Sequence, residues 1–191
     1  MTEPPTVVGL SGSLRDDSGT RIAVDRALAA ADEAGATTEH IDLREWDLPL
    51  YDADANEAGD GPALATRIRE ADAAVVGTPM YHGTVASPLK TALDYCSIDD
   101  VEGTAVGLVA VAGGGFPTPA LEHLRASLLA LKARPLPTQV AIPDSWKQFE
   151  DGQVVDDDVA DRLAMLGEAV TAEISGEAGR RVAETVTPAD D

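Results

Sequence analysis

Short apolar runs in this chain alternate with longer stretches in which apolar residues recur every three or four positions. The short runs have the character of buried strands and cover residues 6–11, 37–41, 73–78, 105–112 and 138–142. The longer stretches predict amphipathic helices over about 20–34, 62–70, 87–96, 118–132 and 158–174. The first of these helices is expected to end near Gly35, with this glycine as its C-cap. Strands that alternate with helices predict an α/β protein with a parallel sheet and right-handed crossovers.

Five such strands fit a flavodoxin-like three-layer sandwich, with a five-stranded parallel sheet of order 2-1-3-4-5. In that order the loops after strands 1, 3 and 4 meet at one sheet edge, where a ligand would bind. Residues 1–175 are expected to form a single domain. Residues 176–191 form an acidic tail with few apolar residues, and this tail is expected to be flexible.

The composition is strongly acidic. Among 191 residues there are 34 Asp and Glu against 14 Lys and Arg, a formal charge of −20. Dispersed acids and scarce lysine favour a halophilic protein that works in concentrated salt, where self-repulsion is screened. An acidic surface for a basic partner is the alternative. The absence of a basic patch argues against nucleic acid as a partner.

Targeting signals and cysteine content indicate the expected location of the protein and the role of its thiol. No apolar window of membrane-spanning length is present, so no membrane association is expected, and residues 1–5 lack the features of a signal peptide. A cytoplasmic location is therefore expected. The single cysteine, Cys96, cannot form an intrachain disulfide and is expected to be a small core residue rather than a reactive thiol.

The loop after the first strand has the residues of a phosphate cradle. Arg15 offers a fork-shaped cation, and Gly12 allows close approach to backbone N–H groups. Hydroxyl donors are supplied by Ser11, Ser13, Ser18 and Thr20. Ser18 could also cap the helix that follows. An ordinary capped turn, with Arg15 in solvent, is the alternative to the phosphate cradle. If an anion binds, Asp16 and Asp17 must point outward.

Two further loops could border a flat heterocycle. In the loop of residues 79–84, backbone N–H groups from Pro79 to Gly83 could follow a ring edge. Tyr81 could stack or fill space, His82 could donate a hydrogen bond or lie exposed, and Met80 is expected to pack rather than react. The glycines Gly113, Gly114 and Gly115 predict either a bare backbone wall for a ring or a surface turn.

No catalytic or metal constellation is evident. His40 and His123 have no second ligand at metal spacing, so both are interpreted as structural or surface residues and no metal is expected. No Ser-His-Asp or Cys-His arrangement is present either.

Three blocks in this order resemble the NADPH-dependent FMN reductase family of flavodoxin-like flavoproteins. Residues 12–18 resemble its GSLRxxS loop, and residues 79–94 resemble its second block, PxYxGSxPGxLKNxxD. The triple glycine, the leucines that follow it and a last strand opened by proline are similar to its third block. The similarity spans about residues 6 to 143. This sequence departs from the family pattern at four positions: the family usually has asparagine at Thr20, glutamate at Met80, asparagine at His82 and glycine at Ser87.

The resemblance implies a cofactor and a reaction. It implies that FMN binds, with its phosphate held by Ser11, Ser13, Leu14, Arg15, Ser18 and Thr20. Its ring would be bordered by Pro79, Met80, Tyr81, His82 and Gly83 on one side and by Gly113, Gly114 and Gly115 on the other. NADPH or NADH would be the co-substrate, and the flavin rather than a catalytic side chain would carry the chemistry. Family members are typically homodimers or homotetramers.

The implied activity is ping-pong hydride transfer from NAD(P)H through FMN to a small-molecule electron acceptor: a quinone, a flavin, an azo compound or a metal oxyanion. A flavodoxin-like electron carrier without NAD(P)H oxidation is the main alternative, and a flavin-free protein of the same fold is another. The 2′-phosphate of NADPH could be held by Arg44, Arg125 or Arg134, and the sequence does not select among them.

Overall fold

A parallel sheet forms the centre of the molecule. The computed structural model describes the backbone of residues 3–185 and the side chains of residues 3–175. Five parallel strands run in the order β2-β1-β3-β5-β6. Their bounds are β1 Thr6–Ser11, β2 Thr37–Asp42, β3 Ala73–Tyr81, β5 Ala105–Val111 and β6 Arg134–Ile142. This is the predicted order 2-1-3-4-5, and the flavodoxin-like fold is confirmed.

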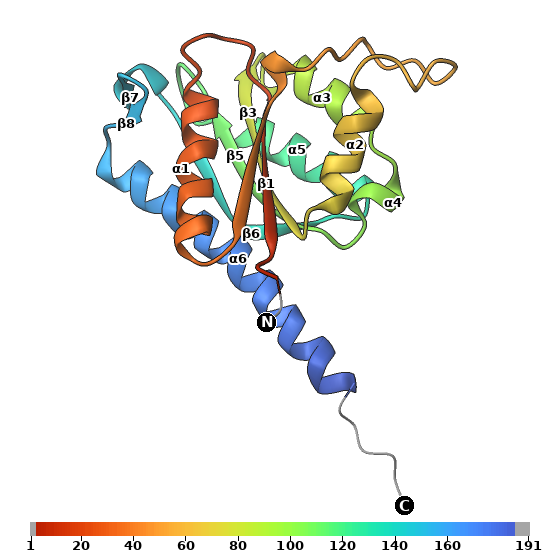
Figure 1. Cartoon of the computed structure of the whole chain (residues 1–191). Helices are drawn as coiled ribbons and strands as arrows, with labels where there is room; N and C mark the ends of the chain where they lie inside the picture. The colour runs from red at the N-terminus through yellow and green to blue at the C-terminus, as the bar shows by residue number, and fades with distance from the viewer. Residues whose placement is uncertain (1–2, 186–191) are drawn as a thin grey trace, which may run out of the picture.

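Helices cover both faces of the sheet. On one face lie α1 (Gly19–Glu33) and α6 (Asp157–Thr185) (Figure 1). On the other lie α2 (Gly61–Glu70), α3 (Ser87–Asp94), α4 (Ile98–Val101) and α5 (Thr118–Ala130). Each face has its own apolar core, and burial of these side chains is the main force that holds the three layers together.

Helix α1 has a recognised signal at each end. The Ser18 hydroxyl accepts a hydrogen bond from the Arg21 N–H at 3.0 Å and caps the first turn, as the sequence predicts. Gly35 follows the last turn with φ of 97°, which confirms it as the residue that ends the helix. The cap fixes the direction in which the chain leaves the loop after β1.

Strand β3 is longer than expected. The chain stays extended through Tyr81 and turns back into β4 (Thr84–Val85), so the predicted loop of residues 79–84 is instead a hairpin. The Gly77 carbonyl accepts from the Gly12 N–H, and strand alternation places Pro79 on the same side, beyond the last residue of β1. Proline is tolerated there because no neighbouring strand needs its missing N–H.

Two residues, His82 and Gly83, turn this hairpin. Their φ values are 53° and 80°, the positive values that two-residue hairpin turns require. Histidine tolerates this conformation better than most residues with a Cβ. The Thr78 hydroxyl accepts from the Ala86 N–H at 3.0 Å and fixes the base of the hairpin.

Strand β6 also differs from its predicted bounds. It begins at Arg134 rather than at residue 138, and its register against β5 shifts between Val106 and Leu108. Pro135 and Pro137 lie in the irregular part, which explains why the apolar pattern alone placed the strand start too late.

Several elements near the chain end were not predicted. A 3-10 helix (Ser145–Lys147) leads into a second hairpin, β7 (Phe149–Glu150) and β8 (Gln153–Val154). Helix α6 continues to Thr185, beyond the expected end near residue 174. Residues 186–191 lie outside the described residues, and the flexibility of the tail over 176–191 stays a prediction.

Cys96 lies in the core, as predicted. Its side chain is 7% exposed, and its thiol faces the carbonyl of Ala92 at 3.4 Å. Burial, followed by the negative charges of Asp100 and Asp94, raises the pKa of this thiol to about 12. The thiol therefore stays protonated and is not a nucleophile.

Asp100 is a buried carboxylate that holds the turn before β5. It is 8% exposed, accepts from the N–H and the hydroxyl of Ser97 at 2.8 and 2.6 Å, and pairs with Arg69 at 2.8 Å. Burial alone would raise its pKa, but the hydrogen bonds from Ser97 and the Arg69 charge outweigh burial and hold the pKa below its ordinary value of 3.8.

We expect Asp100→Asn to lower the free energy of unfolding by about 1–2 kcal/mol at pH 7, because it weakens a capping box and removes a charge-assisted bond. Since the folded pKa is depressed, the carboxylate stabilises the fold fully above its unfolded pKa. That contribution is lost as the pH falls below about 4 through the folded pKa. Urea unfolding at pH 7 and pH 3 should show the difference between variant and wild type shrinking at low pH. Asp99→Asn, at the exposed neighbour, is the control, and an equal loss there would contradict the assignment.

Candidate functional site

The loop after β1 is positioned by backbone bonds at both ends. The Gly12 N–H donates to the Gly77 carbonyl of β3 at 2.9 Å, and at the other end the carbonyl of Ser18, the N-cap of α1, accepts from the Ile22 N–H at 3.1 Å. The four predicted hydroxyl donors, Ser11, Ser13, Ser18 and Thr20, are all buried in this loop region. The Ser11 hydroxyl is fully buried and has no hydrogen-bond partner among the described residues, so a bound group could satisfy it.

Arg15 and its neighbour Asp16 are arranged in a way that is compatible with an anion site. The Arg15 side chain is exposed and makes no hydrogen bond or ion pair within residues 3–175. The Asp16 side chain is 89% exposed, and its carboxylate pairs with Arg44. The Asp16 carbonyl also accepts from Arg21 Nη2 at 2.8 Å. Asp16 therefore points outward and is neutralised, as phosphate binding in this loop would need.

The hairpin of β3 and β4 carries the second group of predicted residues. Pro79 is buried, Met80 is half-buried against the core, and Tyr81 is 48% exposed. His82 lies exposed at the turn beside Gly83. The structure confirms that Met80 packs, whereas the roles of these residues toward a ring stay predictions.

The triple glycine follows β5 at the same sheet edge. Gly113, Gly114 and Gly115 are exposed, and none has the positive φ at which glycine is favoured. A Cβ built on any of the three would meet no atom within 4 Å. Neither backbone conformation nor packing within the described chain explains these glycines, so the bare backbone is free to lie against a ligand.

The three loops form one continuous edge. Gly12 is bonded to Gly77, and Pro79 pairs in register with Val111, so the first two loops and the glycine loop share neighbouring strands. The sequence did not reveal how the glycine loop is held. The Ser145 N–H donates to the Ala112 carbonyl at 2.9 Å, and the Asp144 N–H donates to the Gly114 carbonyl at 2.7 Å.

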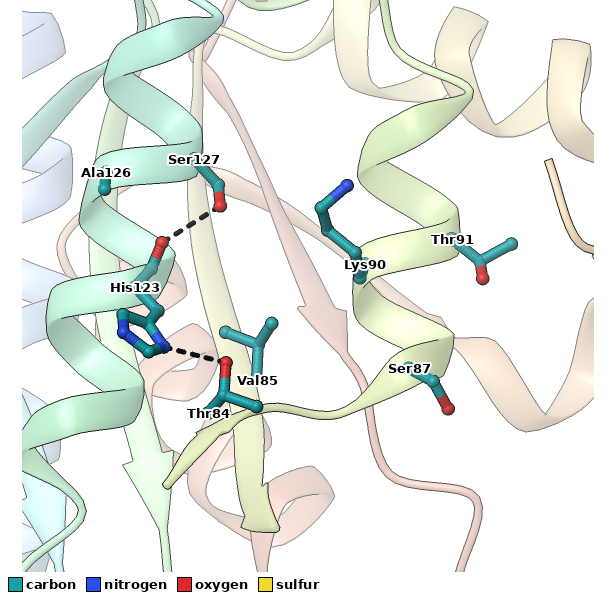
Figure 2. Close-up of a pocket in the computed structure, with 8 residues that line it drawn as sticks. All are labelled: Thr84, Val85, Ser87, Lys90, Thr91, His123, Ala126 and Ser127. Carbon is teal, nitrogen blue, oxygen red and sulfur yellow. Dashed lines mark hydrogen bonds between the residues drawn. The ribbon is translucent and has the colours of Figure 1, made fainter. Parts of the chain in front are cut away.

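A groove lies beside this edge, between α3 and α5. Its volume is about 580 Å³, and it is lined by Ser87 and Lys90 of α3 and by His123 and Ser127 of α5. Figure 2 shows the Lys90 side chain on the side of α3 that faces α5. His123 Nδ1 lies 2.8 Å from the Thr84 hydroxyl and so links α5 to β4. His123 thus has the structural role expected of it.

His40 also has a structural neighbour, since its Nδ1 lies 2.5 Å from Asp25 Oδ1. Among the described residues, no three side chains of His, Cys, Asp or Glu gather in a way that could hold a metal ion. Within residues 3–185, no helix combines the length and the apolar character needed to cross a bilayer.

The sheet order defines a flavodoxin-like protein, and the three predicted loops meet at the carboxyl edge of its sheet. A flavoenzyme NAD(P)H:acceptor oxidoreductase from Paracoccus denitrificans has the same fold, with a TM-score of 0.75 and 24% identity over 90% of this chain and 98% of that one. A flavodoxin from the domain Archaea aligns with a TM-score of 0.65 and 10% identity, over 89% of this chain and 99% of that one.

The chain belongs to the NADPH-dependent FMN reductase family, whose sequence profile matches residues 5–147. An NAD(P)H-dependent FMN reductase of Pseudomonas aeruginosa is 31% identical over 82% of this chain and 88% of its own length. An FMN-dependent NADPH-azoreductase of Staphylococcus saprophyticus is 41% identical over 62% of this chain and 70% of its own length. The protein is thus an oxidoreductase of the NAD(P)H-dependent FMN reductase and azoreductase type.

Proposed function

We propose that the protein transfers a hydride from NAD(P)H through bound FMN to a small acceptor such as a quinone, flavin, azo compound or metal oxyanion, by a ping-pong mechanism. The observation that carries the proposal is a site with two ends. One end has buried hydroxyls and an arginine that makes no ion pair with the described residues, and the other has open backbone over three glycines. FMN, with a phosphate and a flat ring, has the matching chemistry.

The residues present fit FMN at both ends. Ser11, whose buried hydroxyl lacks a partner, and Arg15, whose guanidinium is unpaired among the described residues, would hold the phosphate. Ser13, Leu14, Ser18 and Thr20 would complete this cradle. The backbone from Pro79 to Gly83 and the glycines from Gly113 to Gly115 would border the ring.

When bound, FMN would accept a hydride (two electrons and one proton) from NAD(P)H and give two electrons to the acceptor after the oxidised dinucleotide leaves. The chain's contribution would be orientation and electrostatics. Backbone N–H groups near the ring would stabilise negative charge that develops there. No side chain is assigned as a general acid or base, because His82 is an exposed turn residue and Cys96 is a buried, protonated thiol.

Anaerobic mixing of the FMN-loaded protein with NADPH or NADH tests this proposal. Rapid loss of the flavin absorbance, followed by its return when a quinone is added, is the expected result. Stable flavin absorbance with both dinucleotides would instead support the electron carrier. A colourless protein that takes up no added FMN would support a flavin-free role. The homodimer or homotetramer, the halophilic character and the cytoplasmic location also stay predictions.

A further inference from the structure

A second cavity lies on the outer side of the phosphate loop, between the start of α1 and the segment that follows β6. Its volume is about 440 Å³, within the range of roughly 300–1,000 Å³ that is usual for small-molecule sites. Arg15, Asp17 and Arg21 line it from the α1 side, and Trp146 and Phe149 line it from the other. The proposed FMN contacts leave this cavity without an occupant.

The wall that carries the aromatic residues is fixed in place. A Cβ on Gly19 would lie only 2.6 Å from the Phe149 ring, so the hairpin is seated directly on the first residue of α1. The hairpin turns through Asp151 and Gly152, with φ of 49° and 76°, and the Val155 N–H donates to the Gln148 carbonyl at 2.9 Å. The cavity is therefore a defined feature of the fold.

The cavity meets the proposed FMN site at two places. Arg15, the proposed phosphate ligand, belongs to both. At the other end of the cavity, the N–H groups of Ser145 and Asp144 donate to the carbonyls of Ala112 and Gly114. The segment that carries Trp146 is therefore bonded directly to the glycine loop. A dinucleotide whose nicotinamide lies on the ring would have this cavity beside it.

The chemistry of the lining suits an adenosine. Trp146 is 71% exposed, and Lys147 Nζ covers one face of its ring at 4.6 Å from the centroid, which leaves the other face for a heterocycle. Base stacking on an aromatic side chain is worth about 1–3 kcal/mol. Glu150 and Asp151 supply carboxylates that can accept hydrogen bonds from ribose hydroxyls.

The arginines considered for a 2′-phosphate are all occupied elsewhere. Arg44 pairs with Asp16, and Arg134 pairs with Glu173 at 3.0 Å. Arg125 donates to the carbonyls of Pro135 and Leu136 and to Gln139. None of the three lines the cavity. Of the two arginines that do line it, Arg21 already contacts Asp42 and the Asp16 carbonyl, and Arg15 is assigned to the FMN phosphate. A 2′-phosphate beside Glu150 and Asp151 would therefore face carboxylates without an arginine of its own.

We propose that this cavity binds the adenosine end of the nicotinamide dinucleotide, with adenine stacked on Trp146 and the ribose beside Glu150 and Asp151. The inference rests on the proposed function and deepens it, because it assigns the co-substrate to a place separate from the FMN cradle.

Fluorescence of Trp146 provides the first test, because the chain has only two tryptophans. The FMN-loaded Trp46→Phe variant should show saturable quenching by 5′-AMP and by 2′,5′-ADP, neither of which can reduce a flavin. The Trp146→Phe variant, which keeps Trp46, should show none. Quenching that follows Trp46 instead, or no quenching by either probe in both variants, would overturn the proposal.

Kinetics provide the second test. Trp146→Ala should raise the KM for NADH and NADPH about 10-fold, as loss of one stacking contact implies, with little change in kcat or in FMN affinity. Asp151→Asn keeps a residue that tolerates positive φ, removes one negative charge and should lower the KM for NADPH about threefold. Asp157→Asn, which removes an exposed charge outside the cavity, is the control and should leave both KM values unchanged.

The outcomes separate the two proposals. If wild-type protein is not reduced by either dinucleotide, the proposed function fails. If the flavin is reduced normally but Trp146→Ala leaves both KM values unchanged, only the adenosine site fails. If Asp151→Asn and Asp157→Asn lower the KM equally, the effect is general surface charge and the placement of the ribose beside Asp151 is wrong.

Discussion

Replacing Arg15 with alanine is expected to weaken FMN binding about 10- to 100-fold, the range that loss of a charge-assisted hydrogen bond to phosphate implies. Arg15 makes no ion pair with the described residues, so the substitution should not disturb the fold. Because the arginine is proposed to contact only the phosphate end, the absorbance spectrum of the FMN that still binds should be unchanged. Titration of apoprotein with FMN, followed by flavin fluorescence, measures the affinity.

Riboflavin and Arg26 supply the controls for this prediction. Riboflavin lacks the phosphate, so its affinity should be the same for wild type and Arg15→Ala. Arg26→Ala removes an equal charge from α1, two turns beyond the loop, and should leave FMN affinity unchanged. An unaltered FMN affinity in Arg15→Ala, or a parallel loss of riboflavin affinity, would contradict the phosphate role.

Gly114→Val is expected to abolish most flavin binding while leaving the apoprotein as stable as wild type. Nothing in the described chain lies within 4 Å of a Cβ at this position, and its φ is not positive, so the Cβ meets no clash and the backbone suits a residue other than glycine. Loss of glycine flexibility can even stabilise the fold by up to about 1 kcal/mol. The side chain would occupy the space proposed for the ring, so FMN and riboflavin affinities should fall together, by at least about 10-fold.

This pattern differs from that of Arg15→Ala, which affects FMN alone. Thermal unfolding of the apoprotein should show an equal or higher midpoint for Gly114→Val. Ala130→Val, at an exposed position near the end of α5, controls for the general effect of an added valine side chain. Full flavin affinity in Gly114→Val would show that the glycine loop is only a surface turn.

The sequence predicts the layers of this molecule well because each layer depends on a local pattern. Apolar runs and helical periodicity report which side of an element is buried, and the strand order follows from a known arrangement of such elements. The extension of β3 through Pro79 could not be predicted in this way. It depends on β1 ending opposite Gly77, which is known only once the strands are paired.

In the candidate site, too, local features could be predicted from the sequence and contacts between distant segments could not. Ser18 as a helix cap and Gly35 as a helix end are local features, and both predictions are confirmed. Other contacts join segments about 30 residues apart, and hydrophobic periodicity cannot predict them. They are the pairing of Asp16 with Arg44 and the bonds from residues 144–145 to the glycine loop. The second hairpin did leave a signal, the Asp151-Gly152 pair between short apolar stretches, which is typical of a two-residue turn.

The irregular start of β6 has a consequence for aggregation. β6 is an edge strand, and exposed strand edges can recruit further strands from other molecules. The Arg134 N–H donates to Thr104, toward β5, so the next residue, Pro135, faces the free edge. Pro135 has no N–H, and its carbonyl already accepts from Arg125 at 3.1 Å. This part of the edge offers neither donor nor free acceptor, and it is thereby protected against intermolecular strand addition.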